Sequence, residues 1–186
     1  VVVKERIPKK YRIEQLDTKL RKSRTKSEVK LLTAARKYGV PTPKILNVDE
    51  KKATIMMEFV KGETLKKVFE SASLEEIKRI SFMVGKLIGK LHAGGIVHGD
   101  LTTSNMILSK KKIFFVDFGL AEFSSRIEDA AVDLNLLLEA LRAAHFKVMD
   151  LCWENIVKGY KYEYPKAEEV LRQAKEIEKR ARYMVR

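Results

Sequence analysis

The strongest hydrophobic pattern in the chain is helical and lies near its middle. Between residues 77 and 91, apolar side chains recur every three or four positions, which predicts an amphipathic helix. Ser73, with Glu76 three residues later, forms a capping box at the start of this helix, and two consecutive glycines end it. Further helices are predicted over residues 64–70, 127–144 and 166–182.

The first sixty residues mix strands with helix. The triple valine that opens the chain predicts a buried strand over 1–4, and the stretches 43–48 and 53–60 predict two antiparallel strands. A helix is predicted over 28–37, preceded by a helical spacing of apolar residues from Ile13. Because no turn precedes the first valine, we expect the chain to begin inside a domain. The pattern as a whole predicts an α+β protein.

Composition narrows the class of protein. The chain has 186 residues, of which 45% are hydrophobic, so it buries a sizeable core and is not a disordered chain. No apolar run approaches the roughly 18 residues of a membrane span, and no signal peptide precedes the first charged residue. A single cysteine, Cys152, excludes a disulfide framework and a cysteine-rich metal site. We therefore expect a cytoplasmic protein with one compact domain or two small lobes.

The net charge of +13 is concentrated at the two ends of the chain. Residues 1–30 carry 11 basic and 4 acidic side chains, and residues 158–186 carry 9 and 5, whereas the middle is nearly neutral. Solvated helix faces would produce this pattern, and so would a polyanionic partner such as nucleotide phosphates or RNA. Composition alone leaves both interpretations open.

A group of polar residues follows the central helix, in the segment Ile96–Leu108. His98, Asp100 and Asn105 stand there with an Asp-x4-Asn spacing, and a short apolar strand then leads to Asp117 of an Asp-Phe-Gly sequence. Phosphoryl transfer requires a carboxylate that orients the nucleophile and oxygen ligands that hold Mg²⁺ against the phosphates of ATP. Asp100 fits the first role. Asn105 and Asp117 fit the second, because two adjacent strands present their loops on one side.

This spacing resembles the protein-kinase superfamily, and further positions fit the pattern of that superfamily. By this resemblance, Lys4 at the end of the first strand is the ATP-binding lysine, and Glu28 is its ion-pair partner. Met57 corresponds to the gatekeeper of the hinge, where the backbone of Glu58 and Val60 would bind adenine. The implied cofactors are ATP and Mg²⁺.

The resemblance implies a bilobal kinase-like fold, with a truncated N-lobe over 1–60 and a small, mainly helical C-lobe over 61–186. Asp133 fits the helical aspartate that braces the catalytic loop. Several features depart from the kinase pattern: Gly99 replaces an arginine, Thr102 replaces a lysine, and three residues before the ATP-binding lysine leave no room for a glycine-rich loop. Asp117 and Asp133 lie only 16 positions apart, so the C-lobe is expected to lack an activation segment that docks peptides.

A narrower resemblance rests on the basic motif over 4–12, Ser-Arg-Thr at 23–25, the loop over 98–105 and the basic ending over 180–186. These segments look like the small kinase-like ATPase subunit of the KEOPS complex, the PRPK family. The resemblance implies an ATPase or atypical serine/threonine kinase that supports threonylcarbamoyl-adenosine modification of tRNA. The implied partners are other KEOPS subunits, notably the transferase subunit and a small regulatory subunit. It also implies that tRNA binds through the basic N-terminal region and the C-terminal tail.

Other interpretations stay open at this point. A RIO-like kinase of ribosome assembly would share the fold, although RIO kinases differ in the catalytic loop, and a small-molecule kinase would fit only that loop. A pseudokinase scaffold is the non-enzymatic alternative, and the intact set of motif residues argues against it. We expect Trp153, Tyr160, Tyr162 and Tyr164 to be core or packing residues rather than a platform on which bases stack.

Overall fold

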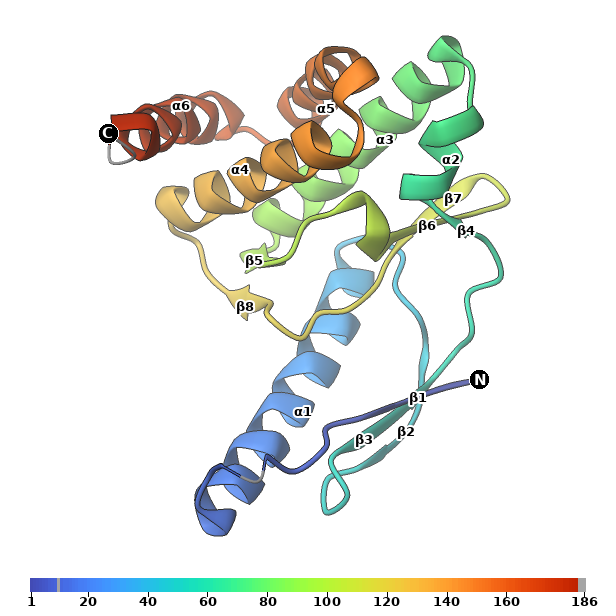
Figure 1. The fold of residues 1–186 in the computed structure, drawn as a ribbon, viewed down its shortest axis with the longest axis vertical. Helices are drawn as coiled ribbons and strands as arrows, with labels where there is room; N and C mark the ends of the chain where they lie inside the picture. Colours follow the sequence, from blue (N-terminus) through green and yellow to red (C-terminus); the bar gives the residue numbers. More distant parts are fainter. Residues whose placement is uncertain (10, 184–186) are drawn as a thin grey trace.

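The N-terminal part of the molecule is an antiparallel three-stranded sheet beside one long helix (Figure 1). The strands β1 (Val2–Glu5), β2 (Ile45–Asp49) and β3 (Thr54–Met57) lie in the order β1-β3-β2, and the helix is α1 (Glu14–Lys37). The structure is a computed structural model that describes residues 1–9 and 11–183. The end of the predicted basic tail, residues 184–186, lies outside the described residues.

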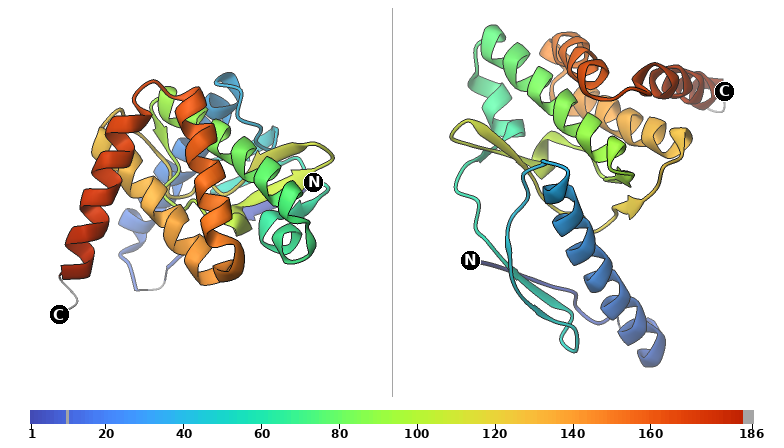
Figure 2. Two further views of the ribbon diagram at one scale, coloured as in Figure 1. Left: turned by 90° about the horizontal axis from the view of Figure 1, so that it is seen from above. Right: turned by 180° about the vertical axis from the view of Figure 1, so that it is seen from behind.

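The remainder of the chain is mainly helical. Its long helices are α3 (Leu74–Ala93), α4 (Ile127–Ala144), α5 (Met149–Glu163) and α6 (Ala167–Tyr183). The shorter elements are β4 (Glu63–Thr64), α2 (Leu65–Ser71), β5 (Ile96–Val97), β6 (Met106–Ser109), β7 (Lys112–Phe115) and β8 (Glu122–Phe123). Strands β4, β6 and β7 form one small sheet, and β5 pairs with β8. Figure 2 shows α6 along one side of the helical part, against α4.

The predicted start of α3 is confirmed, and α1 joins the predicted helix over 28–37 to the helical spacing that precedes it. The Glu76 N–H donates to Ser73 Oγ at 3.2 Å, as a helix cap does. Helix α1 begins at Glu14, where the helical spacing of apolar residues starts, and Asp17 anchors its basic first turns. This carboxylate is 3% exposed and accepts a hydrogen bond from Arg21 Nε at 2.9 Å. An ionic anchor of this kind adds no hydrophobic periodicity to the sequence.

Strand β1 is present as predicted, but it is not buried. It forms the edge of its sheet, paired with β3, and Val1 and Val3 are 75% and 60% exposed. A run of β-branched residues indicates a strand, and it does not distinguish an edge strand from a central one. The prediction of a buried strand over 1–4 was therefore wrong in burial and right in secondary structure.

Helix α5 was not predicted, and its backbone packs directly against that of α3. The backbone carbonyl of Phe82 on α3 lies against the position where Gly159 would carry a Cβ, and the carbonyl of Ile156 on α5 lies in the same way against Gly85. Glycine weakens the helical signal in a sequence. At these two positions glycine lets the two helix backbones touch, so α5 and α3 are held at a fixed spacing.

The hydrophobic core joins α1 to the helices that follow it. Leu31, Leu32 and Ala35 of α1 belong to the same buried cluster as Ile88 of α3 and Leu137 of α4. The predicted α+β, kinase-like class is confirmed, and the lobe boundary between residues 60 and 61 stays a prediction. Within the described residues, no helix is both long enough and apolar enough to cross a membrane.

Candidate active site

A carboxylate on α4 holds the loop between β5 and β6 in place through hydrogen bonds to its backbone. Asp133, 1% exposed, accepts hydrogen bonds from the His98 N–H at 2.7 Å and from the Gly99 N–H at 2.8 Å. This confirms the contact expected of a bracing aspartate. His98 is buried, and its Nε2 lies 3.1 Å from the Val116 carbonyl, so its role is to join the loop to the segment before Asp117.

Asp100 and Asn105 meet within this loop. Asn105 Nδ2 donates to Asp100 Oδ2 at 2.8 Å and to the Asp100 carbonyl at 3.0 Å. Because the amide nitrogen is used in this way, the amide oxygen of Asn105 is left as an acceptor for a cation. The same contact fixes the orientation of the Asp100 carboxylate.

Asp117 follows β7 in an unusual backbone conformation, with φ at +59°. A non-glycine residue in this left-handed region is held there by its surroundings. Its Oδ1 accepts from the Gly119 N–H at 3.2 Å and from Lys4 Nζ at 2.6 Å. Partial burial raises the pKa of the Asp117 carboxyl, but the hydrogen bond and charge of Lys4 outweigh it, so the pKa is lowered overall.

The donor set fits a magnesium ion bound together with a nucleotide. Mg²⁺ is usually held by one or two protein oxygens while phosphates and water complete its shell. Asn105 and Asp117 offer such a pair, with Oδ2 of Asp117 outside the hydrogen bonds that its Oδ1 accepts. Among the described side chains, no three His, Cys, Asp or Glu residues form a metal cluster.

Lys4 and Glu28 form the ion pair that the sequence predicted, and a second cation joins them. Lys4 Nζ lies 2.7 Å from Glu28 Oε1, and Arg6 Nη2 lies 2.6 Å from Glu28 Oε2. Glu28 is 1% exposed, so both of its oxygens are neutralised inside the protein. Arg6 was missed in the sequence. It directly follows β1, and its N–H donates to the Ala53 carbonyl at 3.1 Å, so the extended chain continues and places Arg6 on the same side as Lys4.

The predicted hinge follows β3, and one of its backbone groups, the Glu58 N–H, already has a hydrogen-bond partner within the protein. The Glu58 N–H donates to the Lys44 carbonyl at 2.8 Å, and the Lys44 N–H donates to Glu58 Oε2 at 3.1 Å. Within the described chain, the Glu58 carbonyl and the Val60 N–H have no backbone partner, so they are the groups available to an adenine edge. Met57 and Val60 are buried beside them.

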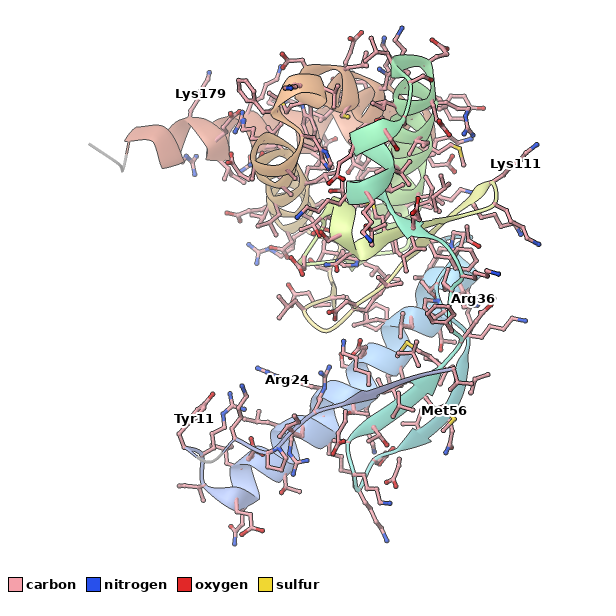
Figure 3. All side chains as sticks on the ribbon, turned by 45° about the vertical axis from the view of Figure 1, so that its right-hand side comes forward. Tyr11, Arg24, Arg36, Met56, Lys111 and Lys179 are labelled. Carbon is pink, nitrogen blue, oxygen red and sulfur yellow. The ribbon has the colours of Figure 1, made fainter. Side chains whose placement is uncertain are left out.

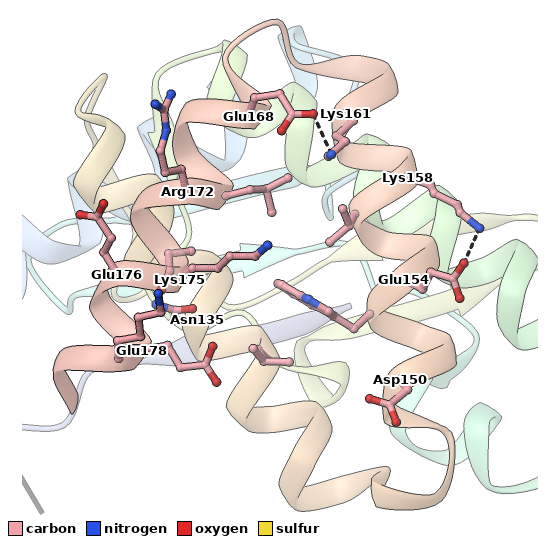
Figure 4. A pocket seen from close by; sticks show the side chains of 16 residues that line it. Asn135, Asp150, Glu154, Lys158, Lys161, Glu168, Arg172, Lys175, Glu176 and Glu178 are labelled. Atoms are coloured by element: carbon pink, nitrogen blue, oxygen red, sulfur yellow. Dashed lines mark hydrogen bonds and ion pairs between the residues drawn. The ribbon is translucent and has the colours of Figure 1, made fainter. Parts of the chain in front are cut away.

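A cavity of about 820 Å³ lies elsewhere, between α4, α5 and α6 (Figure 4). Trp153 lines it, with ion pairs at the rim such as Lys161 to Glu168 at 2.7 Å. None of the kinase-motif residues borders this cavity. Tyr162, on the same helix, is 71% exposed and is not a core residue, but its ring packs against Phe82 and Lys86, as expected of a packing residue.

Comparison with known proteins identifies the family. A model of the RIO domain matches residues 3–126. The KEOPS complex subunit Bud32 of Pyrococcus abyssi is 48% identical over the whole chain, which covers 86% of that protein. The chain belongs to the Bud32 family. A probable serine/threonine-protein kinase and BUD32 homologue of Archaeoglobus fulgidus is 47% identical over the whole chain, which covers 90% of it.

The Bud32 family also includes longer proteins. A probable bifunctional tRNA threonylcarbamoyladenosine biosynthesis protein of Methanocaldococcus jannaschii is 40% identical over 99% of the chain, which covers 33% of that relative. These names confirm the family resemblance drawn from the sequence, and they agree with a kinase-type enzyme. The roles of the individual site residues stay predictions, supported by the geometry above.

Proposed function

We propose that this Bud32-family chain binds Mg²⁺-ATP between the β1–β3–β2 sheet and the catalytic loop and transfers or hydrolyses its terminal phosphoryl group. The observation that carries the proposal is the position of Lys4, whose Nζ lies 2.7 Å from Glu28 on α1 and 2.6 Å from Asp117 after β7. Lys4 would bind the phosphates, with Glu28 orienting it. Such a pairing gathers the phosphate-binding and metal-binding groups of two distant segments at one point.

The remaining residues have separate roles in this proposal. Asn105 and Asp117 would hold Mg²⁺, which when bound neutralises charge on the phosphates. Asp100, oriented by the Asn105 amide, would direct the attacking hydroxyl or water. The Met57 side chain and the backbone of Glu58 and Val60 would bind the adenine.

We also propose that the enzyme works in the cytoplasm with other KEOPS subunits, notably the threonylcarbamoyl transferase subunit and a small regulatory subunit. Two kinds of relative support this: one named as a KEOPS subunit, and longer ones named for tRNA threonylcarbamoyladenosine biosynthesis. In this proposal ATP turnover supports threonylcarbamoyl-adenosine modification of tRNA.

A basic hollow beside the site supports direct contact with RNA phosphates. The hollow, of about 210 Å³, lies between β1 and the start of α1 and is lined by five basic side chains and one acidic side chain. Asp17 beneath it pairs with Arg21 at 2.9 Å and with Arg12 at 3.4 Å, which holds these two guanidinium groups in place. Arg24 also lines the hollow, and Figure 3 shows it projecting from α1 away from Met56.

Measurement of phosphate release from ATP tests the proposal, with and without tRNA and the transferase partner. We expect Mg²⁺-dependent turnover that responds to tRNA when the partner is present. A chain that binds ATP without turnover under all of these conditions would be a pseudokinase scaffold. Turnover that responds to ribosomal precursors, and not to tRNA, would instead indicate a RIO-like kinase of ribosome assembly.

A second experiment tests the RNA contact. Replacement of Arg24 by Gln removes one cation from the hollow, so tRNA binding should weaken and the log–log salt slope should fall by about 1. Lys26→Gln on the same helix is the matched control, because Lys26 is paired with Glu50 at 3.0 Å. Deletion of residues 179–186 should flatten the slope further if the tail also binds. Equal slopes in all four proteins would exclude both contacts.

A further inference from the structure

A buried chain of hydrogen bonds leads from α5 to the catalytic loop. The Tyr160 hydroxyl lies 2.8 Å from His92 Nδ1, and His92 Nε2 lies 3.2 Å from Asp133 Oδ2. The same Asp133 carboxylate accepts the backbone N–H groups of His98 and Gly99. Tyr160, His92 and Asp133 are 0%, 4% and 1% exposed, so water does not compete for these bonds.

The donors in this chain can be assigned. An ionised carboxylate only accepts hydrogen bonds, so His92 donates to Asp133 from Nε2. With the second ring proton absent, Nδ1 is then an acceptor, and the Tyr160 O–H donates to it. Burial raises the pKa of the Tyr160 hydroxyl, which keeps its proton in place for this bond. Loss of the hydroxyl would leave Nδ1 without a donor and would remove the bond that fixes the plane of the ring.

The backbone holds Tyr160 in place for this role. Its neighbour Gly159 allows α5 to touch the backbone of α3, and Gly85 does the same from α3. Since His92 lies near the end of α3, both residues of the hydrogen bond are mounted on helices of fixed spacing. The Tyr160 ring also meets the His92 ring edge to face, with centroids 5.5 Å apart.

We propose that Tyr160 is a positioning residue for catalysis: it sets the orientation of His92, and through Asp133 the position of the His98–Gly99 backbone from which Asp100 extends. The expected effect of Tyr160 on the catalytic rate rests on the proposed ATP-dependent function. It goes beyond the motif residues, since Tyr160 lies on α5, outside every segment that carries the kinase motifs.

Replacement of Tyr160 by Phe tests this, because it removes the hydroxyl and keeps the ring. Tyr164→Phe is the matched control: Tyr164 is 9% exposed and its ring lies 5.5 Å from that of Tyr160, but its hydroxyl donates no hydrogen bond within the described residues. We expect Tyr160→Phe to lower kcat for ATP hydrolysis roughly two- to tenfold, with KM for ATP unchanged, because the bond that it loses orients the loop and does not bind the nucleotide.

Amide hydrogen exchange gives a readout independent of activity. In Tyr160→Phe the His98 and Gly99 amides should exchange faster than in the unmodified chain, and in Tyr164→Phe they should not. His92→Gln should preserve more protection than His92→Leu, since only Gln can both donate to Asp133 and accept from Tyr160. Unchanged exchange at the two amides in Tyr160→Phe would overturn the proposal. Absence of ATP turnover in the unmodified chain would instead overturn the proposed function, and the exchange comparison would still decide the role of Tyr160.

Discussion

The main-chain carbonyl of Leu120 lies against the position at which a side chain on Gly99 would begin. Gly99 also has a φ of +75°, a conformation that side chains rarely adopt. The segment after Asp117 therefore runs directly over the backbone of the catalytic loop. This close approach explains why the chain has glycine where the kinase pattern has arginine.

Substitution of Gly99 should therefore lower the free energy of unfolding by more than the strain of its backbone conformation alone would. Gly95 has a similar φ of +66°, but a Cβ there would make only an ordinary van der Waals contact, 3.8 Å from the Ser124 carbonyl oxygen. We expect Gly95→Ala to lower the free energy of unfolding by about 1 kcal/mol, and Gly99→Ala by about 1–3 kcal/mol more, because only the second displaces a backbone segment. Urea denaturation of the two variants measures the difference. Equal decreases in the free energy of unfolding would show that the segment at Leu120 moves away from a Cβ at position 99 without a cost in stability.

The metal and nucleophile roles predict two different kinetic defects. Asp117→Ala should abolish ATP turnover, because charge on the β- and γ-phosphates is no longer neutralised. Asp100→Asn should leave nucleotide binding nearly intact, since an Asn side chain can still accept from Asn105, and should lower turnover by about two orders of magnitude or more. Steady-state kinetics and nucleotide titration separate these effects. Unchanged turnover in both variants would exclude the assignment.

The sequence predicted the polar residues of the site better than their supports. The spacing of Asp100, Asn105 and Asp117 identified them because these side chains need particular positions in the chain. Arg6 and Tyr160 carry no such spacing: one acts through a strand face, the other through a contact between helices far apart in sequence. Their roles depend on tertiary packing, which a pattern of hydrophobic and polar positions does not record.

The helices show the same difference between what local sequence patterns predict and what tertiary contacts determine. Helix α3 was predicted because it combines a capping box with a regular apolar stripe, two local signals that agree. The first half of α1 was indicated only by the helical spacing of apolar residues from Ile13, because the ionic contacts of Asp17 that help to hold it leave no such pattern in the sequence. Helix α5 was missed because Gly159, which weakens a helix taken alone, is required for its contact with α3.

Transfer to generic peptides should be slow. After Asp117 the chain passes through the two-residue strand β8 and enters α4 at Ile127, so this connection is too short to form a peptide-docking platform. Positioning contributes several kcal/mol to reactions of this kind, and its loss lowers the rate directly. We expect ATP hydrolysis or self-phosphorylation to exceed phosphorylation of a peptide library. Rapid labelling of many library peptides would contradict this.

His98 should make the stability of the fold depend on pH. Burial lowers its pKa, and this outweighs the nearby carboxylates of Asp133, Asp100 and Asp117, which raise it. Its Nδ1 has no hydrogen-bond partner, so a proton added there would be buried without an acceptor. His98 is therefore neutral when folded under conditions in which it is already protonated when unfolded.

The direction of the pH effect follows from this difference. Below the ordinary histidine pKa of about 6.5, the unfolded chain binds a proton that the folded chain does not, so stability falls as the pH falls. The loss should reach up to about 1.4 kcal/mol per pH unit until the lowered pKa of the folded state is passed. Urea denaturation between pH 7.5 and about 5 measures it, in a range above the titration of ordinary carboxylates.

Replacement of His98 by Gln isolates this contribution. The Gln amide can still donate to the Val116 carbonyl but does not titrate, so the variant should be less stable than the unmodified chain at pH 7.5 and should lose less stability on acidification. Burial also lowers the pKa of His145, so His145→Gln is the control. This variant should remove only the part of the pH-dependent loss of stability that is due to His145. If the unmodified chain and His98→Gln show parallel stability curves from pH 7.5 to 5, then His98 accepts a proton in the folded state, and the segment that it joins to Val116 must open to allow it.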